Sequence, residues 1–479
     1  MMLVCKKLPA SIHFLGIAGV AMAQMAVLLS ELGVRVSGSD QNIYPPASDL
    51  LNERGISVSQ GYHPKNIPND VDLVVIGNAL SRGNEEVEAV LGGRFRYVSL
   101  PELVKEICIR GKESIVVTGT HGKTTTTALL AWLLQHAGKD PSFFVGGVPL
   151  NFGRGFQFKD GEHIVVEGDE YDTAFFDKRP KFIHYLPNIL IVNTVEFDHS
   201  DIYPDIQAIE KVFLQLVNIV PRNGLIVANG DCELVRQIVE KAHCTVKTFG
   251  VNDEVNWRVR NITCSEKGTR FELIHEGRCY GDFLIPILGK FNALNATSAL
   301  VVTHHVGILQ ESALRALSLF KGVRRRMELI GNINGIRLYD DFAHHPTAIK
   351  GTLETLKQAY KKHRIWAVLE PRSNTMVRRF HQELLPRALS YADRVVLAPL
   401  HREDRIPISE RLDVKKVVDE LLKIGKVAHY FSDVKDILDL LIQEVMEGDV
   451  VVFMSNGGFH GIQKRFMKLL LNGGFQERH

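Results

Sequence analysis

Short apolar runs alternate with amphipathic stretches along most of the chain. Within residues 11–40, the β-rich run IHFLGIAGV precedes AMAQMAVLLSEL, whose apolar residues recur at helical spacing, and VRVSGSD then predicts a second strand that ends in an acid. The run DLVVIGN (72–78) and the helix-like PELVKEI extend this pattern toward Gly111. We therefore expect a first α/β domain over residues 1–110, with its boundary near 108–112.

A second series of strands begins with SIVVTGT (114–120), and the segment TTTTALLAWLLQHAG that follows predicts a helix. Residues 245–288 have short β-like runs and turns, which favours a small antiparallel insertion. A helix near 292–306 and an arginine-rich turn, GVRRRMELIG (322–331), complete a second domain that we place at 111–322. Helical segments separate three further strand-like runs, a pattern typical of a mostly parallel sheet: HIVVEGD (163–169), NILIVNT (188–194) and GLIVANG (224–230).

The strand–helix pattern continues to the end of the chain. Its strand candidates are the start of IRLYDDFAHHPTAIKGTLETL, RIWAVLEP (364–371), RVVLAPL (394–400) and DVVVFMSNGG (449–458). We expect a third domain at 323–479, and thus three α/β domains in all.

Composition and charge exclude several classes of protein. Among 479 residues, 57 Lys and Arg nearly balance 55 Asp and Glu, so nothing indicates binding to nucleic acid or an anionic membrane. The apolar runs are much shorter than the ~18 residues of a transmembrane helix, and the start MMLVCKKLPASIHFLG lacks the pattern of a signal peptide. The 6 cysteines are scattered without a C-x-x-C pair, so we expect reduced thiols, no zinc site and a cytoplasmic protein.

The strongest local motif is GTHGKTTT (119–126), which follows an apolar strand and opens a helix. Backbone N–H groups and the positive end of the helix would hold phosphates there, with Lys123 on the β- and γ-phosphates and the Thr124 hydroxyl on Mg²⁺. A strict P-loop has glycine five residues before Gly122, where this chain has Val117, so the motif is a shorter variant. The alternative is a Gly/Thr-rich turn that merely starts a helix.

Acidic side chains follow two further strands of the second domain. EGDEYD (167–172) ends one strand, and EFDH (196–199) lies just beyond another. Ligands of open α/β sheets bind at the carboxyl ends of strands, so both motifs are expected beside the phosphate loop. Carboxylates there suit Mg²⁺, with His199 as a less usual ligand. Each motif taken alone is also typical of a solvated acidic loop or a structural histidine.

The first domain has a weaker glycine motif, GIAGVAM (16–22), after its first strand. It is G-x-x-G rather than the full dinucleotide fingerprint, although Asp40 lies roughly where a ribose-binding acid is expected. The motif indicates either a site for a dinucleotide or nucleotide diphosphate, or tight packing of a helix on a strand. Met22 and Met25 are expected in the core.

Six motifs in this order resemble the Mur ligase family: GTHGKTT, EGDEYD, EFDH, FNALNA, GVRRRME and DDFAHHP. The resemblance spans essentially the whole chain and implies an ATP-dependent enzyme that adds an amino acid or peptide to UDP-N-acetylmuramic acid. It also implies a Rossmann-like N-terminal domain for the UDP-sugar, a central P-loop ATPase-like domain, and a C-terminal Rossmann-like domain that closes over ATP and the acceptor.

Three passages resemble the muropeptide-recycling branch of the family: GSDQNIYPPASDLL, GNALSRGNEEVEAVL and MSNGGFHGIQ. That branch joins L-alanyl-γ-D-glutamyl-meso-diaminopimelate to UDP-N-acetylmuramate in peptidoglycan recycling. The sister branch, which adds L-alanine alone, shares the G-x-x-G turn and the D-D-x-x-H-H-P element and stays the alternative. The implied partners are these substrates, without nucleic acid or membrane, and a monomer or weak dimer is expected.

The resemblance further implies roles for individual residues. Residues expected to hold ATP are Gly119, Thr120, His121, Gly122, Lys123, Thr124, Thr125, Asn292, Asn295, Arg326 and Asp341. The expected catalytic residues are Lys123, Glu167 and His199, and the expected Mg²⁺ ligands are Thr124, Glu167 and His199. Expected substrate contacts are Gly16, Gly19, Asp40, Asn78, Ser81, His344, His345, Arg372, Ser373 and Asn374. Although Arg324 and Arg325 adjoin Arg326, the following Met327-Glu328 favours Arg326 for the contact with ATP.

The element expected to bind the acceptor differs from that of the L-alanine branch, which resembles P-H-R-Y-T-R where this chain has PRSNTM (371–376). The more neutral pocket favours a longer acceptor. For its distant carboxylates the nearest candidates in sequence are Arg372, Arg378 and Arg379. The D-N-P-R element that another branch uses for diaminopimelate is absent, and no lysine is assigned the carbamylated role found in some members.

Two alternatives come from other classes of protein. An NAD(P)-dependent oxidoreductase would use the G-x-x-G turn, but it leaves Lys123, Glu167 and His199 without a role. A non-catalytic nucleotide-binding scaffold would bind ATP without forming ADP, and the intact set of metal ligands argues against it.

Overall fold

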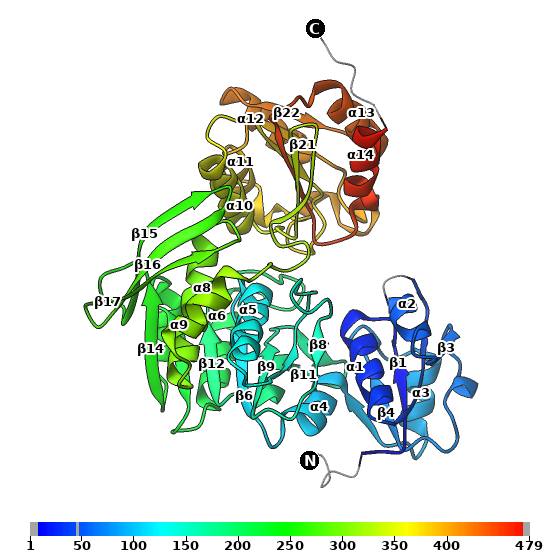
Figure 1. Cartoon of the computed structure of the whole chain (residues 1–479). Helices are drawn as coiled ribbons and strands as arrows, with labels where there is room; N and C mark the ends of the chain where they lie inside the picture. The colour runs from blue at the N-terminus through cyan, green and yellow to red at the C-terminus, as the bar shows by residue number, and fades with distance from the viewer. Residues whose placement is uncertain (1–7, 45–46, 473–479) are drawn as a thin grey trace. The chain divides into compact units, whose positions relative to one another are not determined.

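The computed structural model describes residues 8–44 and 47–472 (Figure 1). They form two compact units. Unit 1 consists of the described residues up to Glu196, together with Ile206–Asn256 and Ser298–Ala316. Unit 2 consists of Phe197–Asp205, Trp257–Thr297 and the described residues from Leu317 onward. Of the cysteines, Cys5 lies outside the described residues.

The chain up to Ser99 forms a parallel sheet in unit 1, with the strand order β3-β2-β1-β4-β5. Its strands are β1 (Ser11–Leu15), β2 (Arg35–Asp40), β3 (Ser57–Gln60), β4 (Leu73–Ile76) and β5 (Tyr97–Ser99). Its helices are α1 (Val20–Glu31), α2 (Ala47–Asn52), α3 (Glu85–Gly92) and α4 (Leu100–Val104). Figure 1 shows α1 and α3 on either side of the strands, and Met22 and Met25 of α1 are buried in the core, as predicted.

The second sheet of unit 1 has the order β14-β13-β12-β6-β9-β7-β8 and is parallel except for β8. Its strands are β6 (Glu113–Thr118), β7 (Ser142–Phe144), β8 (Phe156–Gln157), β9 (His163–Glu167), β12 (Ile189–Val192), β13 (Leu225–Asn229) and β14 (Thr245–Gly250). A separate hairpin is formed by β10 (Asp172–Ala174) and β11 (Asp177–Pro180). The helices are α5 (Lys123–His136), α6 (Ile206–Asn218) and α7 (Glu233–Val239). The predicted, mostly parallel sheet is confirmed.

The expected antiparallel insertion begins later than residue 245. Thr245–Gly250 (β14) instead pairs parallel with β13, because α7 returns the chain before it re-enters the sheet. The antiparallel strands belong to unit 2 and are β15 (Trp257–Ser265), β16 (Gly268–His275) and β17 (Arg278–Ile285). Glu276 and Gly277, both with positive φ, form the tight turn between β16 and β17.

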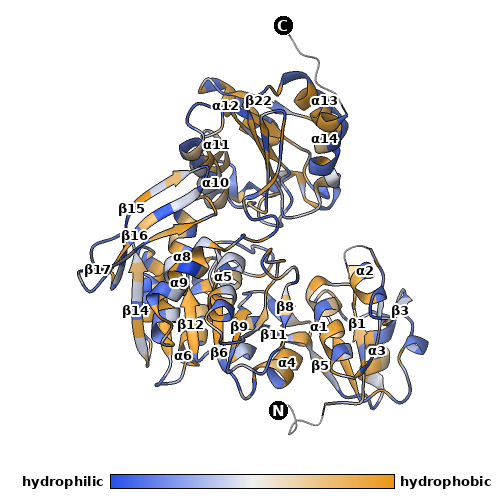
Figure 2. Ribbon diagram, in the orientation of Figure 1, coloured by the Kyte–Doolittle hydropathy of each residue, from blue (hydrophilic) through white to orange (hydrophobic). Residues whose placement is uncertain are grey.

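The last sheet, in unit 2, has the order β18-β19-β23-β20-β21-β22. Its strands are β18 (Glu328–Ile333), β19 (Ile336–Asp341), β20 (Ile365–Leu369), β21 (Arg394–Leu397), β22 (Val427–Tyr430) and β23 (Val450–Met454). The remaining helices of the chain are α8 (Lys290–His305), α9 (Gln310–Ser318), α10 (Pro346–Ala359), α11 (Leu384–Leu389), α12 (Val414–Lys423), α13 (Val434–Glu444) and α14 (Ile462–Leu471). One hydrophobic cluster packs α10, α11 and α12 on one face of the sheet, and another packs α13 and α14 on the other. Figure 2 shows the strands between these helices as hydrophobic ribbon.

The arginine-rich turn expected at 322–331 is shorter than predicted, because Glu328–Ile333 forms β18. β18 pairs antiparallel with β19, and Asn334 and Gly335, both with positive φ, make the connecting turn. An Asn-Gly pair between two apolar runs is a strong hairpin signal that the strand–helix pattern obscured. No helix among the described residues is both long and apolar enough to cross a membrane.

Candidate active site

The phosphate loop lies between β6 and α5, where two glycines adopt backbone angles that side chains disfavour. Gly119 has φ 122° and Gly122 has φ 80°. A Cβ at Gly119 would lie 2.7 Å from the Thr194 carbonyl oxygen, and the Thr120 N–H donates to that same oxygen at 2.6 Å. The loop is therefore fixed against the chain that leaves β12. It presents the N-terminus of α5, a helix of 14 residues, whose positive dipole end favours an anion.

Lys123, at the first turn of α5, contacts a carboxylate that sequence reasoning did not single out. Its Nζ lies 2.9 and 2.7 Å from the two carboxylate oxygens of Glu170. Burial by itself lowers the pKa of Lys123, but the carboxylates of Glu170 and Asp169 outweigh burial, so the pKa is raised. Lys123 is therefore a firmly charged ammonium. The acid-rich motif EGDEYD was the signal for Glu170, but it did not say which acid meets the lysine.

Thr124 and Glu167 lie together beside this ion pair. The Thr124 hydroxyl donates to Glu167 Oε1 at 2.8 Å, and the Gly146 N–H donates to Glu167 Oε2 at 2.7 Å. Two oxygen donors of this kind fit Mg²⁺, which prefers carboxylate and hydroxyl ligands. Nearby, Asn193 Oδ1 and Thr194 Oγ1 are buried acceptors with no hydrogen-bond partner within the described parts of the chain. The loop therefore lies beside two buried oxygen atoms whose hydrogen bonds the described parts of the chain do not supply.

The other residues of the predicted ATP loop have contacts within unit 1. The Thr120 hydroxyl accepts from the Glu196 N–H at 2.9 Å, and His121 Nε2 lies 3.4 Å from the Glu196 carboxylate. Thr125 is buried on α5. The loop, Glu167 and Glu170 are therefore brought together by the carboxyl ends of β6 and β9 and by the chain after β12.

His199 belongs to unit 2, so the structure does not place it in one unit with Thr124 and Glu167. It has φ 58°, and its N–H donates to Asp198 Oδ1 at 2.7 Å. Burial by itself raises the pKa of Asp198, but the imidazoles of His199 and His344 hold it well below its usual range.

The segment Phe197–Asp205 also contacts the element predicted to bind the acceptor. The Asn374 amide donates to Asp201 at 2.9 Å, and the Ser200 N–H donates to the Thr375 hydroxyl at 3.3 Å. Within unit 2, the segment that carries His199 is therefore attached to the loop after β20.

Two of the three consecutive arginines have distinct surroundings. The Arg325 guanidinium donates to the carbonyl oxygens of Ser455 and Gly457, and it lies 3.5 Å from Asp340. Arg326 lies over the Phe342 ring, 4.4 Å from its centroid. The positive charge of Arg326 also lowers the pKa of Asp341, although burial dominates and the net shift is upward. Arg325 therefore supports the fold of unit 2, and the structure places Arg326 beside Asp341, the other residue expected at ATP.

The amides of Asn292 and Asn295 contact each other, at 3.1 Å between Nδ2 of Asn295 and Oδ1 of Asn292. Asn292 also donates to the Leu288 carbonyl at 2.7 Å. Both side chains are buried and serve the first turns of α8 in these contacts.

The predicted UDP-binding residues lie at the carboxyl ends of β1, β2 and β4. Gly16 has φ 83°, and Asp40 accepts from the Ala18 N–H at 2.9 Å, so the acid holds the glycine turn in place. Gly19 caps the start of α1, and Asn78 and Ser81 are exposed after β4.

Tyr62, after β3, is a further residue at this edge that sequence reasoning missed. Its hydroxyl would lie 3.9 Å from a Cβ at Gly16. Burial, and then the charge of Asp40, raises the pKa of Tyr62 to about 12.

The predicted acceptor residues divide into local and longer-range contacts. His345 caps α10 by accepting from the Thr347 N–H, and His344 Nδ1 lies 2.9 Å from the Phe342 carbonyl oxygen. Ser373 accepts from the Met376 N–H at 3.1 Å. Of the three arginine candidates for the distant carboxylates, Arg378 pairs with Glu410 and Arg379 donates to the Arg411 carbonyl oxygen. Arg372 pairs with Glu370 at 3.4 Å, between β20 and β23.

Parallel sheets with a lysine-bearing phosphate loop at the strand ends define an α/β protein of the phosphate-binding class. Three family models match successive parts of it: "Mur ligase family, catalytic domain" at residues 11–112, "Mur ligase middle domain" at 117–303, and "Mur ligase, glutamate ligase domain" at 325–457. The chain belongs to the Mur ligase family. The family and the three α/β domains expected from the sequence are confirmed, and an oxidoreductase is excluded.

Relatives with known names extend over almost the full chain. The UDP-N-acetylmuramate--L-alanyl-gamma-D-glutamyl-meso-2,6-diaminoheptandioate ligase of Escherichia coli (strain K12) is 40% identical over 95% of this chain and 97% of its own. The Haemophilus influenzae ligase of the same name is 36% identical over 96% and 99%. The UDP-N-acetylmuramate--L-alanine ligase of Lachnoclostridium phytofermentans is 31% identical over 94% and 96%.

Solved structures show the same two kinds of enzyme. A murein peptide ligase from Psychrobacter arcticus has a TM-score of 0.71 and 35% identity, covering 97% of this chain and 99% of its own. A UDP-N-acetylmuramate-alanine ligase from Thermotoga maritima has a TM-score of 0.81 and 25% identity, with the same coverage.

Proposed function

We propose that this chain is an ATP- and Mg²⁺-dependent ligase that joins L-alanyl-γ-D-glutamyl-meso-diaminopimelate to UDP-N-acetylmuramate, in the cytoplasmic recycling of peptidoglycan. The observation that carries this proposal is the 40% identity, over 95% of the chain, to the Escherichia coli ligase named for that reaction. The corresponding identity to the L-alanine ligase of Lachnoclostridium phytofermentans is 31%.

The chemistry explains why such an enzyme needs a charged phosphate loop. A carboxylate is a poor electrophile, so ATP first transfers its γ-phosphoryl group to the lactyl carboxylate of UDP-N-acetylmuramate and leaves as ADP. The α-amine of the peptide then attacks the acyl phosphate, loses a proton and expels phosphate from a tetrahedral intermediate. Lys123 stabilises the moving phosphoryl group, because its ammonium can exchange Glu170 for phosphate oxygens.

The metal would be held by the oxygen donors beside that lysine. Thr124 and Glu167, which share a hydrogen bond, would hold one Mg²⁺, and His199 would be a ligand of a second. When bound, Mg²⁺ offsets the repulsion between the attacking carboxylate and the γ-phosphate. Gly119–Thr125 hold the nucleotide, with Asn292, Asn295, Arg326 and Asp341 as the further ATP contacts.

Each of the three domains would bind a different substrate. Residues 1–110 bind the UDP moiety through Gly16, Gly19, Asp40, Asn78 and Ser81. Residues 111–322 bind ATP, and residues 323–479 bind the acceptor through His344, His345, Arg372, Ser373 and Asn374.

The loop after β20 supports a peptide acceptor. A site for free L-alanine needs a cation near a carboxylate one carbon from the reacting amine, because an unpaired, desolvated carboxylate is costly. This chain has Ser373 and Met376 where the L-alanine branch resembles arginines, and Met376 is fully buried in the core. In the tripeptide that carbon is a neutral amide, which needs no cation.

Measurement of ADP release tests the proposal directly. The assay uses UDP-N-acetylmuramate with L-alanine, L-alanyl-γ-D-glutamate, the tripeptide and a tetrapeptide as acceptors. We expect kcat/KM to be far higher for the tripeptide than for L-alanine. Equal or better use of L-alanine would assign the chain to the sister activity. ATP binding without ADP formation, with every acceptor, would support a non-catalytic scaffold.

The second candidate is the UDP-N-acetylmuramate–L-alanine ligase. It is favoured by one observation, the TM-score of 0.81 to the Thermotoga maritima alanine ligase against 0.71 to the Psychrobacter arcticus murein peptide ligase. The sequence identities, 25% and 35%, have the opposite order. We give the identities more weight, because acceptor choice depends on side chains and a TM-score compares backbones.

A further inference from the structure

A group of charged and polar side chains gathers at the carboxyl ends of three adjacent strands of unit 2. β23, β20 and β21 are neighbours in the last sheet. The strand-end cluster, as we call it, consists of Glu370, Arg372, His401, Arg402, Ser455 and His460. In open α/β sheets, ligands bind in the crevice beyond these strand ends.

The centre of the strand-end cluster is a fixed carboxylate. Glu370 is buried, its N–H donates to the Met454 carbonyl at 3.0 Å, and its carboxylate accepts from the Ser455 hydroxyl at 2.5 Å. Arg372 lies 3.4 Å from the other carboxylate oxygen. A Cβ at Gly457 would overlap the Arg372 guanidinium, so glycine at that position lets the arginine lie against the backbone. Arg372 is thus held by packing as well as by charge.

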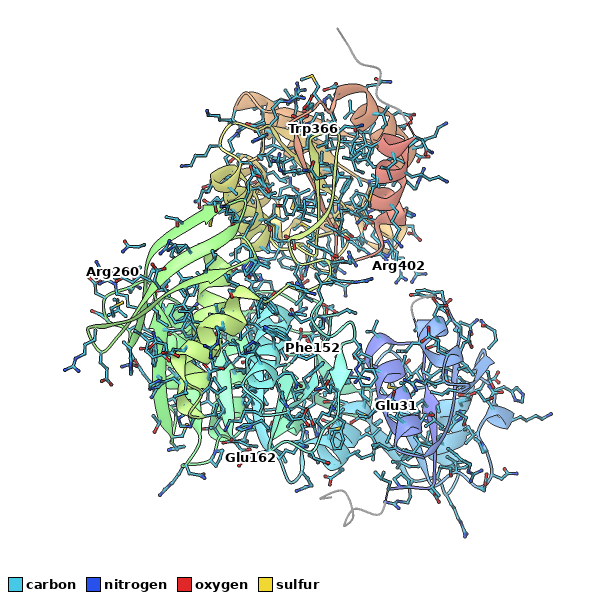
Figure 3. The ribbon with its side chains drawn as sticks, in the orientation of Figure 1. Glu31, Phe152, Glu162, Arg260, Trp366 and Arg402 are labelled. Carbon is cyan, nitrogen blue, oxygen red and sulfur yellow. The ribbon has the colours of Figure 1, made fainter. Side chains whose placement is uncertain are left out.

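His401 and Arg402 join Arg372 through the chain that leaves β21. The His401 N–H donates to the Pro371 carbonyl oxygen at 3.0 Å, which connects the ends of β20 and β21. Burial lowers the pKa of His401, and the positive charges of Arg372 and Arg402 lower it further. Arg402 is exposed and has φ 53°, and Figure 3 shows its side chain at the rim of unit 2, pointing away from the sheet.

The chain after β23 adds a strained segment to the same strand ends. Phe459 has φ 45°, an unusual value for a bulky side chain, and its ring is fully buried in the core. Burial of the Phe459 ring therefore compensates for the backbone strain. The next residue, His460, is exposed and also has a positive φ, 50°. Backbone strain of this kind is typical of functional sites. Asn456 Oδ1 is a buried acceptor without a hydrogen-bond partner among the described residues.

The cations of the strand-end cluster exceed its carboxylates. Glu370 is the one carboxylate in the cluster as defined, against the two arginines Arg372 and Arg402. A site with excess positive charge attracts an anion, and the planar guanidinium matches a carboxylate. We propose that Arg372, His401 and Arg402 bind the carboxylate end of the acceptor peptide that lies farthest from its reacting amine. This inference rests on the proposed function. It assigns the distant carboxylates of the acceptor to these three residues and not to Arg378 and Arg379, which have partners elsewhere.

Steady-state kinetics with two acceptors tests this assignment. The tripeptide has the terminal diaminopimelyl residue, and L-alanyl-γ-D-glutamate lacks it. In Arg402→Gln, we expect KM for the tripeptide to rise about tenfold, as for the loss of one charge-assisted hydrogen bond, with kcat changed by less than about twofold. KM for the dipeptide should not change. Arg405→Gln removes an exposed charge three residues away and should leave both acceptors unaffected.

The outcomes separate this inference from the proposed function. If wild-type enzyme uses the tripeptide and Arg402→Gln leaves its KM unchanged, or raises KM for both acceptors alike, the assignment is wrong and the proposed function stands. If wild-type enzyme prefers L-alanine, both are wrong. Calorimetric titration of the tripeptide into each variant, in the presence of UDP-N-acetylmuramate and a non-hydrolysable ATP analogue, should reproduce the KM difference as a change in affinity. Inorganic phosphate that competes equally in wild type and Arg402→Gln would indicate a nonspecific anion site.

Discussion

The phosphate loop of unit 1 and the strand-end cluster of unit 2 both hold cations for anionic ligands, but they treat those cations differently. Lys123 has 13% of its side chain exposed and contacts both oxygens of Glu170. Arg372 has 30% exposed and touches its carboxylate partner at 3.4 Å, while Arg402 is exposed on the surface. Lys123 is therefore almost enclosed together with its counterion, whereas Arg372 is partly exposed beside Glu370 and Arg402 is solvated by water.

Burial explains this difference. An unpaired ammonium in the interior costs several kcal/mol, so a buried lysine can persist without ligand only beside a carboxylate. A ligand phosphate must then displace Glu170 from Lys123. At the strand-end cluster, water reaches Arg372 beside Glu370 and surrounds Arg402, so each charge contact contributes less. Substitution of Lys123 should therefore have a larger effect than substitution of an arginine of the strand-end cluster.

The largest effect is expected for Lys123→Ala. Loss of one preorganised charge at a transition state costs about 10²–10³-fold in rate or more, so turnover should disappear in ADP-release assays. The variant also leaves Glu170 buried without its lysine, which should cost about 3–5 kcal/mol of unfolding free energy. Chemical denaturation measures that loss independently of activity.

A double variant separates the two effects of Lys123→Ala. Lys123→Met with Glu170→Gln removes both charges and should recover most of the stability while turnover stays abolished. Lys181→Ala is the matched control, because Lys181 pairs with Asp169 in the same acidic motif. It should retain activity. Near-wild-type turnover in either Lys123 variant would remove the phosphate-loop assignment.

The second effect concerns Mg²⁺. Glu167→Gln and His199→Ala should each raise the Mg²⁺ concentration for half-maximal activity by about tenfold or more, because each removes a proposed ligand. Binding of UDP-N-acetylmuramate should weaken less. Asp172→Asn, at the far end of the same motif and paired with Lys178, should leave the Mg²⁺ requirement unchanged. If neither Glu167→Gln nor His199→Ala changes it, both residues are structural.

The same contrast explains what the sequence could predict. The phosphate loop is contiguous, so a local motif predicts its lysine and threonine. The apolar runs IHFLGIAGV, 114–120 and 364–371 predict strands that the structure confirms, because buried parallel strands are continuously apolar. The strand-end cluster combines the ends of β20, β21 and β23, which are distant in sequence. No local pattern shows that His401 lies beside Arg372.

Two misses have specific physical causes. The start of β18 falls within the predicted turn because the preceding arginines, 324–326, dominated the pattern, although Asn334-Gly335 is a hairpin signal. The partner of Lys123 was not predicted, because Glu167, Asp169 and Glu170 are chemically alike and only the fold decides which of them meets the lysine. In both cases, tertiary structure chose among residues that the sequence left equivalent.

Within unit 2, the adjacent residues Arg325 and Arg326 allow a structural arginine to be compared with one expected to bind ATP. Arg325→Gln removes a guanidinium from two backbone carbonyls, Ser455 and Gly457, and should lower the unfolding free energy by about 1.5–3 kcal/mol. Arg326→Gln should instead raise KM for ATP about tenfold, as for one lost charge contact, with little change in Tm. Thermal melts and ATP kinetics on both variants distinguish these roles. The reverse pattern would show that Arg325 is the ATP contact.

The smallest effect is a pH dependence at Asp341, a buried carboxyl of unit 2 that contrasts with the lysine-paired Glu170. Burial raises the pKa of Asp341 above its ordinary 3.8, against the hydrogen bond from Thr352 and the charge of Arg326. The folded chain therefore holds this proton more tightly than the unfolded chain. Below pH 3.8 both states are protonated, so this carboxyl contributes its full share of stability, and that share is lost as pH rises from 3.8 through the raised pKa.

Asp341→Asn should remove this loss. Its amide oxygen can still accept from the Met327 N–H, and the Thr352 hydroxyl can turn to accept from the new amide. We expect the Tm of the variant relative to wild type to increase between pH 4 and pH 7, by about 2–4 °C for each kcal/mol recovered in a unit of this size. Asp419→Asn, exposed on α12, is the charge-matched control and should give a constant difference. A constant difference for Asp341→Asn as well would show that Asp341 binds its proton equally in the folded and unfolded chains, and the contrast with Glu170 would then not depend on burial.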